Sequence, residues 1–389
     1  MNSQEKRKKS KPVLKEVDQL TIRRQWRSFD FTLLILVCGF AAFGIVMVGT
    51  VSAGAFAGQR LFYITGIILL IAAALIDYHL IANFYIPIYL LMILLLLILI
   101  VIGPDQDTGT ARWIPIGPVS IQPSEFGKIF MIVFLSKLID KKKEIFNNVF
   151  VLLGILALIV IPVLMVARQP SLSASLVIVA LSICILFGAQ IKFRYIAGGL
   201  ALAAMAAAFL YWDWQNPEHL VIDKILGPYQ MKRIITFSNP DAVDDDASFQ
   251  IKQSLQAIGS GMLGGKGLRK GAFFIPAATN DFIFSALAEK LGFIGCAAVL
   301  AAIFLIITKC ILIANRATDT LGRLIAIGVA GMLAFEVVVN VGVATAILPN
   351  TGMPFPFLSS GGSAMWVHMA AIGLVLNVGL FKTKSIFKG

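Results

Sequence analysis

Long apolar runs separated by short polar connections dominate this chain. The runs Leu90–Ile102 and Val149–Val166 are too long and too apolar for the core of an ordinary globular domain. About 20 apolar residues cross a bilayer as a helix, and a helix satisfies its own backbone hydrogen bonds in lipid. The pattern therefore predicts an all-α integral membrane protein with about ten transmembrane helices, at residues 31–51, 61–77, 80–102, 123–139, 149–167, 172–190, 194–212, 282–308, 325–347 and 363–381.

The distribution of Lys and Arg predicts the direction of these spans. With the N-terminus in the cytoplasm, the cytoplasmic segments hold 21 Lys and Arg residues, and the short outer loops hold only Arg60, Arg112 and Arg168. Cytoplasmic loops of membrane proteins carry such an excess. Because the asymmetry requires an even number of spans, we expect both termini in the cytoplasm.

The overall composition agrees with a membrane protein. Of the 389 residues, 58% are hydrophobic and only 14% are charged, and the mean hydropathy is +0.86. The three histidines are scattered, so they predict no histidine-rich metal site. No C-x-x-C spacing occurs, and all four cysteines lie in or beside apolar runs, where a role in helix packing is favoured over disulfide or metal binding: Cys38, Cys184, Cys296 and Cys310.

The chain divides into a tail and a membrane domain. Residues 1–28 form a basic cytoplasmic tail that we expect to be largely disordered, and residues 29–389 form the polytopic domain. The tail favours contact with anionic lipid, at about 1 kcal/mol per basic residue, over nucleic acid, because no aromatic residues are interleaved with its cations. A large outer loop, residues 213–281, lies between spans seven and eight, and loops of this length are usually functional or disordered.

Asp281 is the first candidate for chemistry, because it stands at the outer lip of span eight. A carboxylate at a membrane surface loses hydration, so it is expensive unless it has a function. The alternative is structural, since aspartate is a favoured residue for capping the start of a helix.

Further outward-facing patches carry charge. Arg112 and Trp113 precede span four, where Glu125 and Lys128 share one helix face and form either a structural ion pair or the lining of a polar cavity. Arg168 is suited to binding a phosphate, because its planar guanidinium group binds oxyanions bidentately. The alternative is that it anchors its helix at the membrane interface.

Two irregular segments complete the outer side. Lys266 and Arg269 lie among glycines that allow close approach of an anion to the backbone. The run 350–362 contains prolines and glycines that interrupt a helix, a break tolerated at membrane depth where it lines a cavity, and Glu336 and Asn340 lie one helical turn apart just before it. Together these patches predict a lipid-linked anionic substrate handled at the outer membrane surface.

Four motifs in order give the chain a family resemblance. The sequences A-R-W-I, Q-P-S-E-F-G-K, D-F-I-F-S-A-L-A-E-K-L-G-F-I-G and P-F-P-F-L-S-S-G-G resemble the SEDS family, which includes RodA, FtsW and SpoVE, from about residue 30 to 382. The resemblance implies a peptidoglycan glycosyltransferase of the bacterial cytoplasmic membrane. It would polymerise lipid II beside a class B penicillin-binding protein in elongation, division or sporulation.

The resemblance also implies roles for individual residues. Asp281 matches the family's essential acid and would act as general base on the 4-hydroxyl of the acceptor GlcNAc. Trp113 matches its tryptophan, and Glu125 and Lys128 match its membrane ion pair. Positive charge for the leaving undecaprenyl pyrophosphate would come from a divalent cation, Mg²⁺ or Mn²⁺, and from this set: Arg112, Arg168, Lys266 and Arg269.

The sequence departs from the family pattern at three places. Ser171 stands where an acid is usual, the run before Asp281 reads P-A-A-T-N-D and lacks a glutamate and a histidine, and Arg112 is one arginine where two are usual. The departures bear on divalent-cation binding and on activity. Two other functions remain open, a lipid II flippase or other lipid transporter and a non-catalytic scaffold for a penicillin-binding protein.

Overall fold

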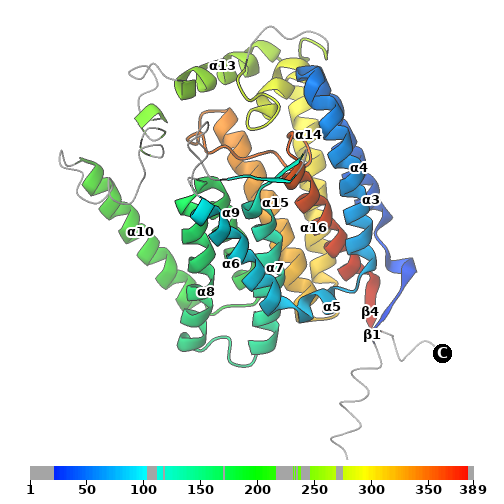
Figure 1. Cartoon of the computed structure of the whole chain (residues 1–389), viewed down its shortest axis with the longest axis vertical. Coiled ribbons are helices and arrows are strands. Elements are labelled where there is room, and N and C mark those ends of the chain that lie inside the picture. Colours follow the sequence, from blue (N-terminus) through cyan, green and yellow to red (C-terminus); the bar gives the residue numbers. More distant parts are fainter. Residues whose placement is uncertain are drawn as a thin grey trace, which may run out of the picture.

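The computed structural model describes residues 22–102, 112–116, 119–169, 171–215, 231, 233, 235–237, 246–268 and 275–383. Within these residues the protein is a bundle of long helices with two short two-stranded sheets (Figure 1). In chain order the helices of the bundle are α3 (Phe31–Val51), α4 (Ala53–Leu75), α5 (Tyr78–Asn83), α6 (Tyr85–Ile102), α7 (Pro123–Lys142), α8 (Val149–Arg168), α9 (Leu172–Gly188), α10 (Phe193–Gln215), α13 (Asp246–Gly261), α14 (Ile283–Asn315), α15 (Thr320–Ala344) and α16 (Gly362–Leu380).

The predicted helices are present in all ten ranges. Six of them are long and apolar enough to cross a membrane, and two shorter apolar helices cover Tyr85–Val101 and Ser173–Gly188. A multi-pass membrane protein is thereby confirmed. The count of ten spans and their direction stay predictions.

Small polar side chains fix where several helices begin. A side-chain oxygen accepts a hydrogen bond from a backbone N–H of the first turn, which satisfies a donor that has no partner within the helix. The residues that do this are Asp30 for α3, Ser52 for α4, Asp77 for α5, Asn148 for α8 and Asp319 for α15.

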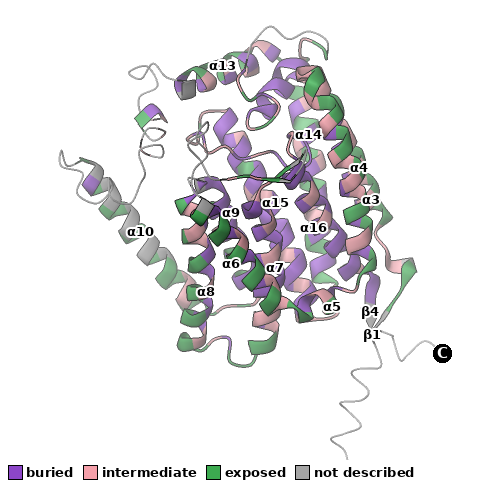
Figure 2. Ribbon diagram, in the orientation of Figure 1, coloured by how far each residue is buried: buried purple, intermediate pink, exposed green. Residues whose placement is uncertain are grey.

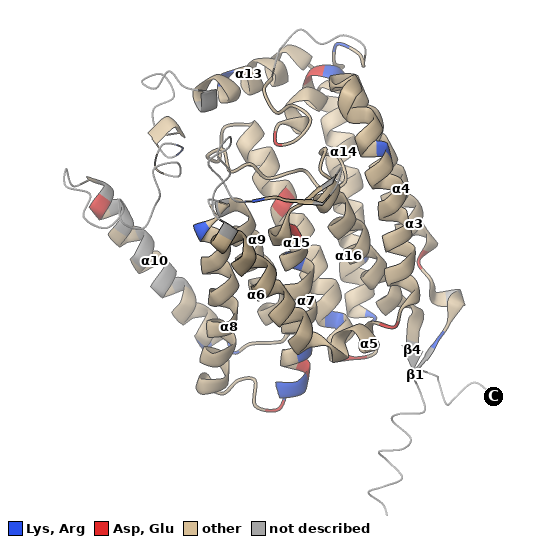
Figure 3. Cartoon of the chain, viewed as in Figure 1, with Lys and Arg blue, Asp and Glu red and all other residues tan. Residues whose placement is uncertain are grey.

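The core of the bundle lies around α15 and α16. Figure 2 shows these two helices buried along most of their length, whereas α4, α6 and α8 are exposed on their outer faces. The exposed positions are large and apolar, as expected of a surface that meets lipid, and include Leu61, Ile64 and Ile68 on α4, Leu90 and Leu94 on α6, and Phe150 and Leu153 on α8. In Figure 3 the charged residues lie mainly near the ends of the helices.

The two ends of the described chain meet at one end of the bundle. Strand β1 (Ile22–Arg24) pairs antiparallel with β4 (Phe381–Thr383), and a 3-10 turn, Trp26–Ser28, leads from β1 toward α3. Residues 22–28, which we expected to belong to a disordered tail, are therefore structured. Residues 1–21 lie outside the described residues. Helix α13 lies at the opposite end of the molecule (Figure 1).

Helix α14 is broken at Gly292, whose φ is 66°. Loop 262–267 supplies the missing hydrogen bonds: Lys266 N–H donates to the Glu289 carbonyl, and Phe293 N–H donates to the Met262 carbonyl. This arrangement fixes the first part of α14, which begins two residues after Asp281.

Candidate functional site

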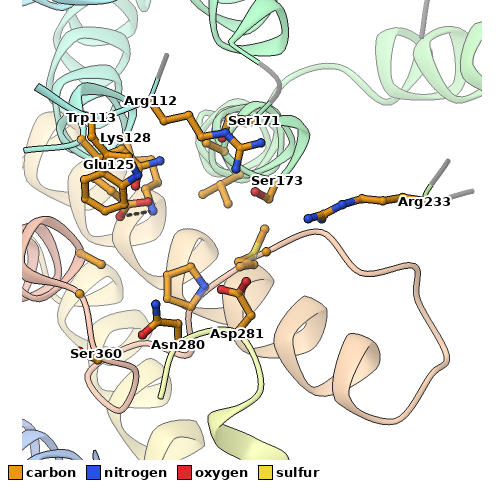
Figure 4. A pocket seen from close by; sticks show the side chains of 18 residues that line it. Arg112, Trp113, Glu125, Lys128, Ser171, Ser173, Arg233, Asn280, Asp281 and Ser360 are labelled. Atoms are coloured by element: carbon orange, nitrogen blue, oxygen red, sulfur yellow. Dashed lines mark ion pairs between the residues drawn. The ribbon is translucent and has the colours of Figure 1, made fainter. Parts of the chain in front are cut away.

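A polar cavity of about 280 Å³ opens where α7, α9, α14 and α16 begin (Figure 4). The start of α16 lies at the opposite end of that helix from β1 and β4 (Figure 1). Concave sites that gather a few polar groups are the default binding sites of proteins. Its described lining includes Arg112, Trp113, Gln122, Glu125, Lys128, Ser171, Ser173, Arg233, Asn280, Asp281, Gly352 and Ser360.

Asp281 enters the cavity from a turn that precedes α14. Its backbone carbonyl accepts a hydrogen bond of 2.9 Å from the Asn340 side chain, which also donates to the Met353 carbonyl at 2.7 Å. The helix α14 has Phe282 at its N-cap and no side-chain cap hydrogen bond. The structure therefore gives no support to a capping role for Asp281 and points its carboxylate into the cavity (Figure 4).

Two arginines face this carboxylate. Burial raises the pKa of Asp281 above its usual value, and the positive charges of Arg233 and Arg112 act against that rise. Functional acids and bases often have a pKa that is shifted by burial and by neighbouring charges. The half-buried carboxyl group of Asp281, which faces Arg233 and Arg112, has such surroundings.

The loop 350–361 forms one wall of the cavity and is tied to the turn before Asp281. Ser359 Oγ donates to the Asn280 carbonyl at 2.6 Å, and Ser360 N–H donates to the Thr279 carbonyl at 2.7 Å. A Cβ atom added to Gly352 would lie 3.3 Å from Asp281 Oδ2 and 3.9 Å from Arg233 Nη1. This glycine, with φ +70°, lets the backbone approach both charged groups.

Glu125 and Lys128 lie in the wall on α7, and their ion pair is present. Lys128 Nζ lies 2.7 Å from Glu125 Oε2 and 2.6 Å from Glu336 Oε1, and His368 Nε2 lies 2.6 Å from Glu336 Oε2. All four residues are buried, at most 5% exposed, and they join three helices, α7, α15 and α16. The pair is thus part of a larger buried group, of which Glu125 and Lys128 line the cavity.

Arg112 and Trp113 precede a short hairpin, β2 (Ile114–Ile116) and β3 (Val119–Ile121). Arg112 Nε donates to the Gln169 carbonyl at 3.4 Å, and the Gln169 amide donates to the Leu96 carbonyl at 3.0 Å. Trp113 is 49% exposed at the edge of the cavity. Both residues therefore stand at the predicted site.

The other predicted cations are placed differently. Arg168 is exposed at the end of α8 and is not among the described residues that line the cavity. Lys266 Nζ pairs with Glu289 Oε1 at 3.0 Å and also lies outside that lining. Arg269 lies outside the described residues.

Arg233 also lines the cavity, although the sequence did not predict it there. This residue reaches the cavity from the large loop, and its Nη1 donates to the Asn350 carbonyl at 2.5 Å. The signal was available, because a basic run, M-K-R, interrupts a loop on the side of the membrane where cations are scarce.

A resident divalent cation does not fit the described cavity. Mg²⁺ and Mn²⁺ prefer carboxylate and carbonyl oxygens. The two described carboxylates of the lining are Glu125, which is paired with Lys128, and Asp281, which faces two arginines. Over the described ranges no three His, Cys, Asp or Glu side chains gather into a possible metal site. No step below is assigned to a metal ion.

Comparison with known protein families gives a match over nearly the whole chain. Residues 25–384 match the family described as cell cycle protein, which is named for FtsW, RodA and SpoVE. The chain is 32% identical over 377 residues to a probable peptidoglycan glycosyltransferase FtsW of Trichlorobacter lovleyi, covering 92% of this chain and 95% of the relative. It is 37% identical over 278 residues to stage V sporulation protein E of Bacillus subtilis, covering 69% and 71%. It is 36% identical over 278 residues to the peptidoglycan glycosyltransferase MrdB of Escherichia coli, also covering 69% and 71%.

Solved structures show the same fold. One similar chain, 26% identical, comes from a structure described as the structural coordination of polymerization and crosslinking by a peptidoglycan synthase complex, with a TM-score of 0.77 over 91% of this chain and 98% of that one. The rod shape determining protein RodA of Thermus thermophilus, 25% identical, gives a TM-score of 0.67 over 91% and 97%.

Proposed function

The chain belongs to the FtsW, RodA and SpoVE family of cell cycle proteins, and on that premise we propose that it is a peptidoglycan glycosyltransferase that polymerises lipid II at the outer face of the bacterial cytoplasmic membrane. Relatives that match most of its length carry that enzyme name, and its apolar helices make it a multi-pass membrane protein. The observation that carries the proposal is the carboxylate of Asp281 in a cavity that it shares with Arg112 and Arg233.

In the proposed reaction, Asp281 acts as general base. The 4-hydroxyl oxygen of the acceptor GlcNAc attacks C1 of the donor MurNAc while its proton passes to the Asp281 carboxylate. The bond between C1 and the pyrophosphate oxygen breaks, and its electron pair leaves with undecaprenyl pyrophosphate. General-base assistance of this kind contributes about 10²–10⁴-fold to a rate.

The position of Asp281 suits this role. The turn that carries it is held by Asn340 and by the loop 350–361, so the backbone of Asp281 is positioned before substrate arrives. Preorganised groups stabilise a transition state without reorganisation during the reaction. The exposed face of Trp113 at the edge of the cavity gives an aromatic surface for a sugar ring.

The buried group below the cavity favours an enzyme over a transporter. A transporter must pass its substrate to the opposite side of the membrane. Here Glu125 and Lys128 line the cavity and contact Glu336 and His368 in a buried group that joins α7, α15 and α16. A site approached from the outer side alone fits this arrangement better.

We also propose the expected topology and partner. Ten spans with both termini in the cytoplasm agree with β1 and β4 at one end of the bundle and the cavity and α13 at the other. A class B penicillin-binding protein is the proposed partner, because a similar chain occurs in a peptidoglycan synthase complex that polymerises and crosslinks.

The test is a lipid II assay with the purified protein and an Asp281→Asn variant, each with and without the partner. Asparagine keeps the shape of the side chain but cannot accept the proton. We expect wild-type protein to form glycan chains, and the variant to remain folded and bound to its partner while the rate falls at least 100-fold. A variant that still makes chains at nearly the wild-type rate would remove Asp281 from the mechanism. A wild-type protein that makes none, with or without its partner, would favour the scaffold.

A further inference from the structure

We infer that Gln59 of α4 is a positioning residue for the proposed reaction, because it holds the loop 350–361 against the turn that carries Asp281. The observation that carries the inference is a pair of hydrogen bonds from the Gln59 amide to the backbone on both sides of Ser360, next to the bonds that join this loop to the turn. The inference rests on the proposed function for the role of Asp281.

Gln59 is a buried amide on a helix whose outer face is apolar. Among the four buried residues of α4, a helix that the structure describes over its whole length, it alone is polar, and it is 1% exposed. A buried amide is costly unless it is hydrogen-bonded. Gln59 Nε2 donates to the Ser359 carbonyl at 3.1 Å, and Gln59 Oε1 accepts from the Gly361 N–H at 3.3 Å. The side chain therefore satisfies two backbone groups of the loop and is satisfied by them.

The same stretch of the loop binds the turn before α14. Ser359 Oγ donates to the Asn280 carbonyl at 2.6 Å, and the Ser360 N–H donates to the Thr279 carbonyl at 2.7 Å. Ser359 thus binds the α4 amide through its carbonyl and the turn through its hydroxyl group. Because Asn280 directly precedes Asp281, two successive hydrogen bonds lead from α4 to the backbone beside the proposed base.

The packing of α4 on α16 sets the position of this amide. Gln59, Phe62 and Gly66 are three and four residues apart, so they lie on one face of the helix. A Cβ atom added to Gly362 would lie 2.6 Å from the Phe62 ring, and one added to Gly66 would lie 3.0 Å from Met369 Cγ. The two glycines allow close contact between the helices at the point where the loop ends. Gln59 therefore meets the loop from a helix that is itself held in place.

Gln59 acts on the reaction through the loop, because it lies outside the described lining of the cavity. Removing its amide leaves the Ser359 carbonyl and the Gly361 N–H without this partner, so the loop and the turn can shift together. A misplacement of about 1 Å at a reacting group can cost about 10²-fold in rate. The residues that line the cavity remain, so the loss should appear in kcat rather than in KM.

The test compares lipid II polymerisation by wild type, Gln59→Met and Thr65→Val. Methionine has a similar length to glutamine but forms neither hydrogen bond. Thr65 is the matched control, because it lies on the same helix and accepts a hydrogen bond of 2.7 Å from Trp366 Nε1 of α16. We expect Gln59→Met to lower kcat at least tenfold with KM within about twofold of wild type, whereas Thr65→Val keeps both values within about twofold. A rise in KM with kcat unchanged, or losses of kcat that follow the melting temperature alike in both variants, would overturn the inference.

Two further variants test the path and guard against misfolding of Gln59→Met. If Gln59 acts through Ser359, adding Gln59→Met to Ser359→Ala should lower kcat little further, because both changes break the same connection. Losses that multiply would overturn the inference. Gln59→Asn keeps the amide but is one methylene shorter and cannot reach both backbone groups, so its kcat should fall severalfold. A Gln59→Asn protein with the wild-type kcat would also overturn it.

Hydrogen–deuterium exchange in detergent separates this inference from the proposed function, because it needs no activity. Backbone amides of residues 277–283 should exchange faster in Gln59→Met than in wild type, and at the wild-type rate in Thr65→Val. Unchanged exchange in Gln59→Met, when the wild type makes glycan chains, overturns the inference and leaves the proposed function standing. Faster exchange in a protein that never polymerises lipid II supports the path from Gln59 to the turn and contradicts the polymerase.

Discussion

The ammonium group of Lys128 lies 2.6 Å from a carboxylate oxygen of Glu336, although the two residues are 208 positions apart. The contact joins α7 to α15 in the centre of the bundle, and Glu125 lies 2.7 Å from the same ammonium group. One lysine therefore contacts two carboxylates, of which Glu336 is fully buried and Glu125 lines the cavity.

We predict that Lys128→Met destabilises the protein strongly. Removing one member of a buried ion pair leaves an uncompensated charge and costs roughly 3–5 kcal/mol. Adding Glu336→Gln should recover more of the loss than adding Glu125→Gln, because water in the cavity can reach Glu125 but not Glu336. Thermal unfolding in detergent compares the three variants. If Glu336→Gln and Glu125→Gln restore the same amount of stability to Lys128→Met, the two carboxylates depend equally on Lys128.

We predict that the acidic limb of the pH–rate profile reports Asp281. The base must be ionised, and burial raises its pKa while Arg233 and Arg112 act against that rise. As the pH is lowered, activity should therefore be lost with a midpoint at a higher pH than the pKa of an ordinary aspartate. Arg233→Gln removes an opposing charge, so the limb should move to still higher pH in the variant's residual activity. An unmoved limb would mean that another group titrates.

We predict that loop 262–268 faces the outside of the cell. Met262 is 78% exposed at the end of the bundle that holds the cavity. In a protein whose native cysteines are replaced, Met262→Cys should react with an impermeant thiol reagent in intact cells. A cysteine at Lys192, on the predicted cytoplasmic side, is the control and should react only after permeabilisation. The reverse labelling pattern would invert the topology.

Features set by neighbouring residues could be predicted from the sequence. Helices occupy all ten apolar ranges because lipid offers no partner for the backbone, so each apolar run must satisfy its own hydrogen bonds locally. The Glu125–Lys128 pair is three residues apart on one helix and was found for the same reason. Asp281 was found because a lone carboxylate at the end of an apolar run stands out.

Features that depend on packing between distant segments could not be predicted from the sequence. Glu336 and His368 join Lys128 only once α7, α15 and α16 are assembled. Arg233 is held at the cavity by a hydrogen bond to the Asn350 carbonyl, and these two residues are 117 positions apart in the sequence. Lys266 looked like a phosphate-binding residue beside glycines, but the fold of its loop places it on Glu289.

Gly352 lies close to both Asp281 and Arg233. Its φ of +70° is unfavourable for any residue with a Cβ atom, and a Cβ atom there would lie 3.3 Å from Asp281 Oδ2. Gly352→Ala should therefore shift loop 350–361 against Asp281 and Arg233 and reduce polymerisation.

The matched control is Gly264→Ala, since a Cβ atom at Gly264 would meet nothing within 4 Å and its φ is not in the left-handed region. That variant should keep its activity. The comparison measures glycan synthesis and melting temperature together. The strain in Gly352→Ala acts where Asp281 and Arg233 approach each other. We therefore expect a large loss of activity together with only a small decrease in melting temperature. If Gly352→Ala polymerises lipid II as well as the control does, the close approach of backbone, acid and arginine at this point has no part in the reaction.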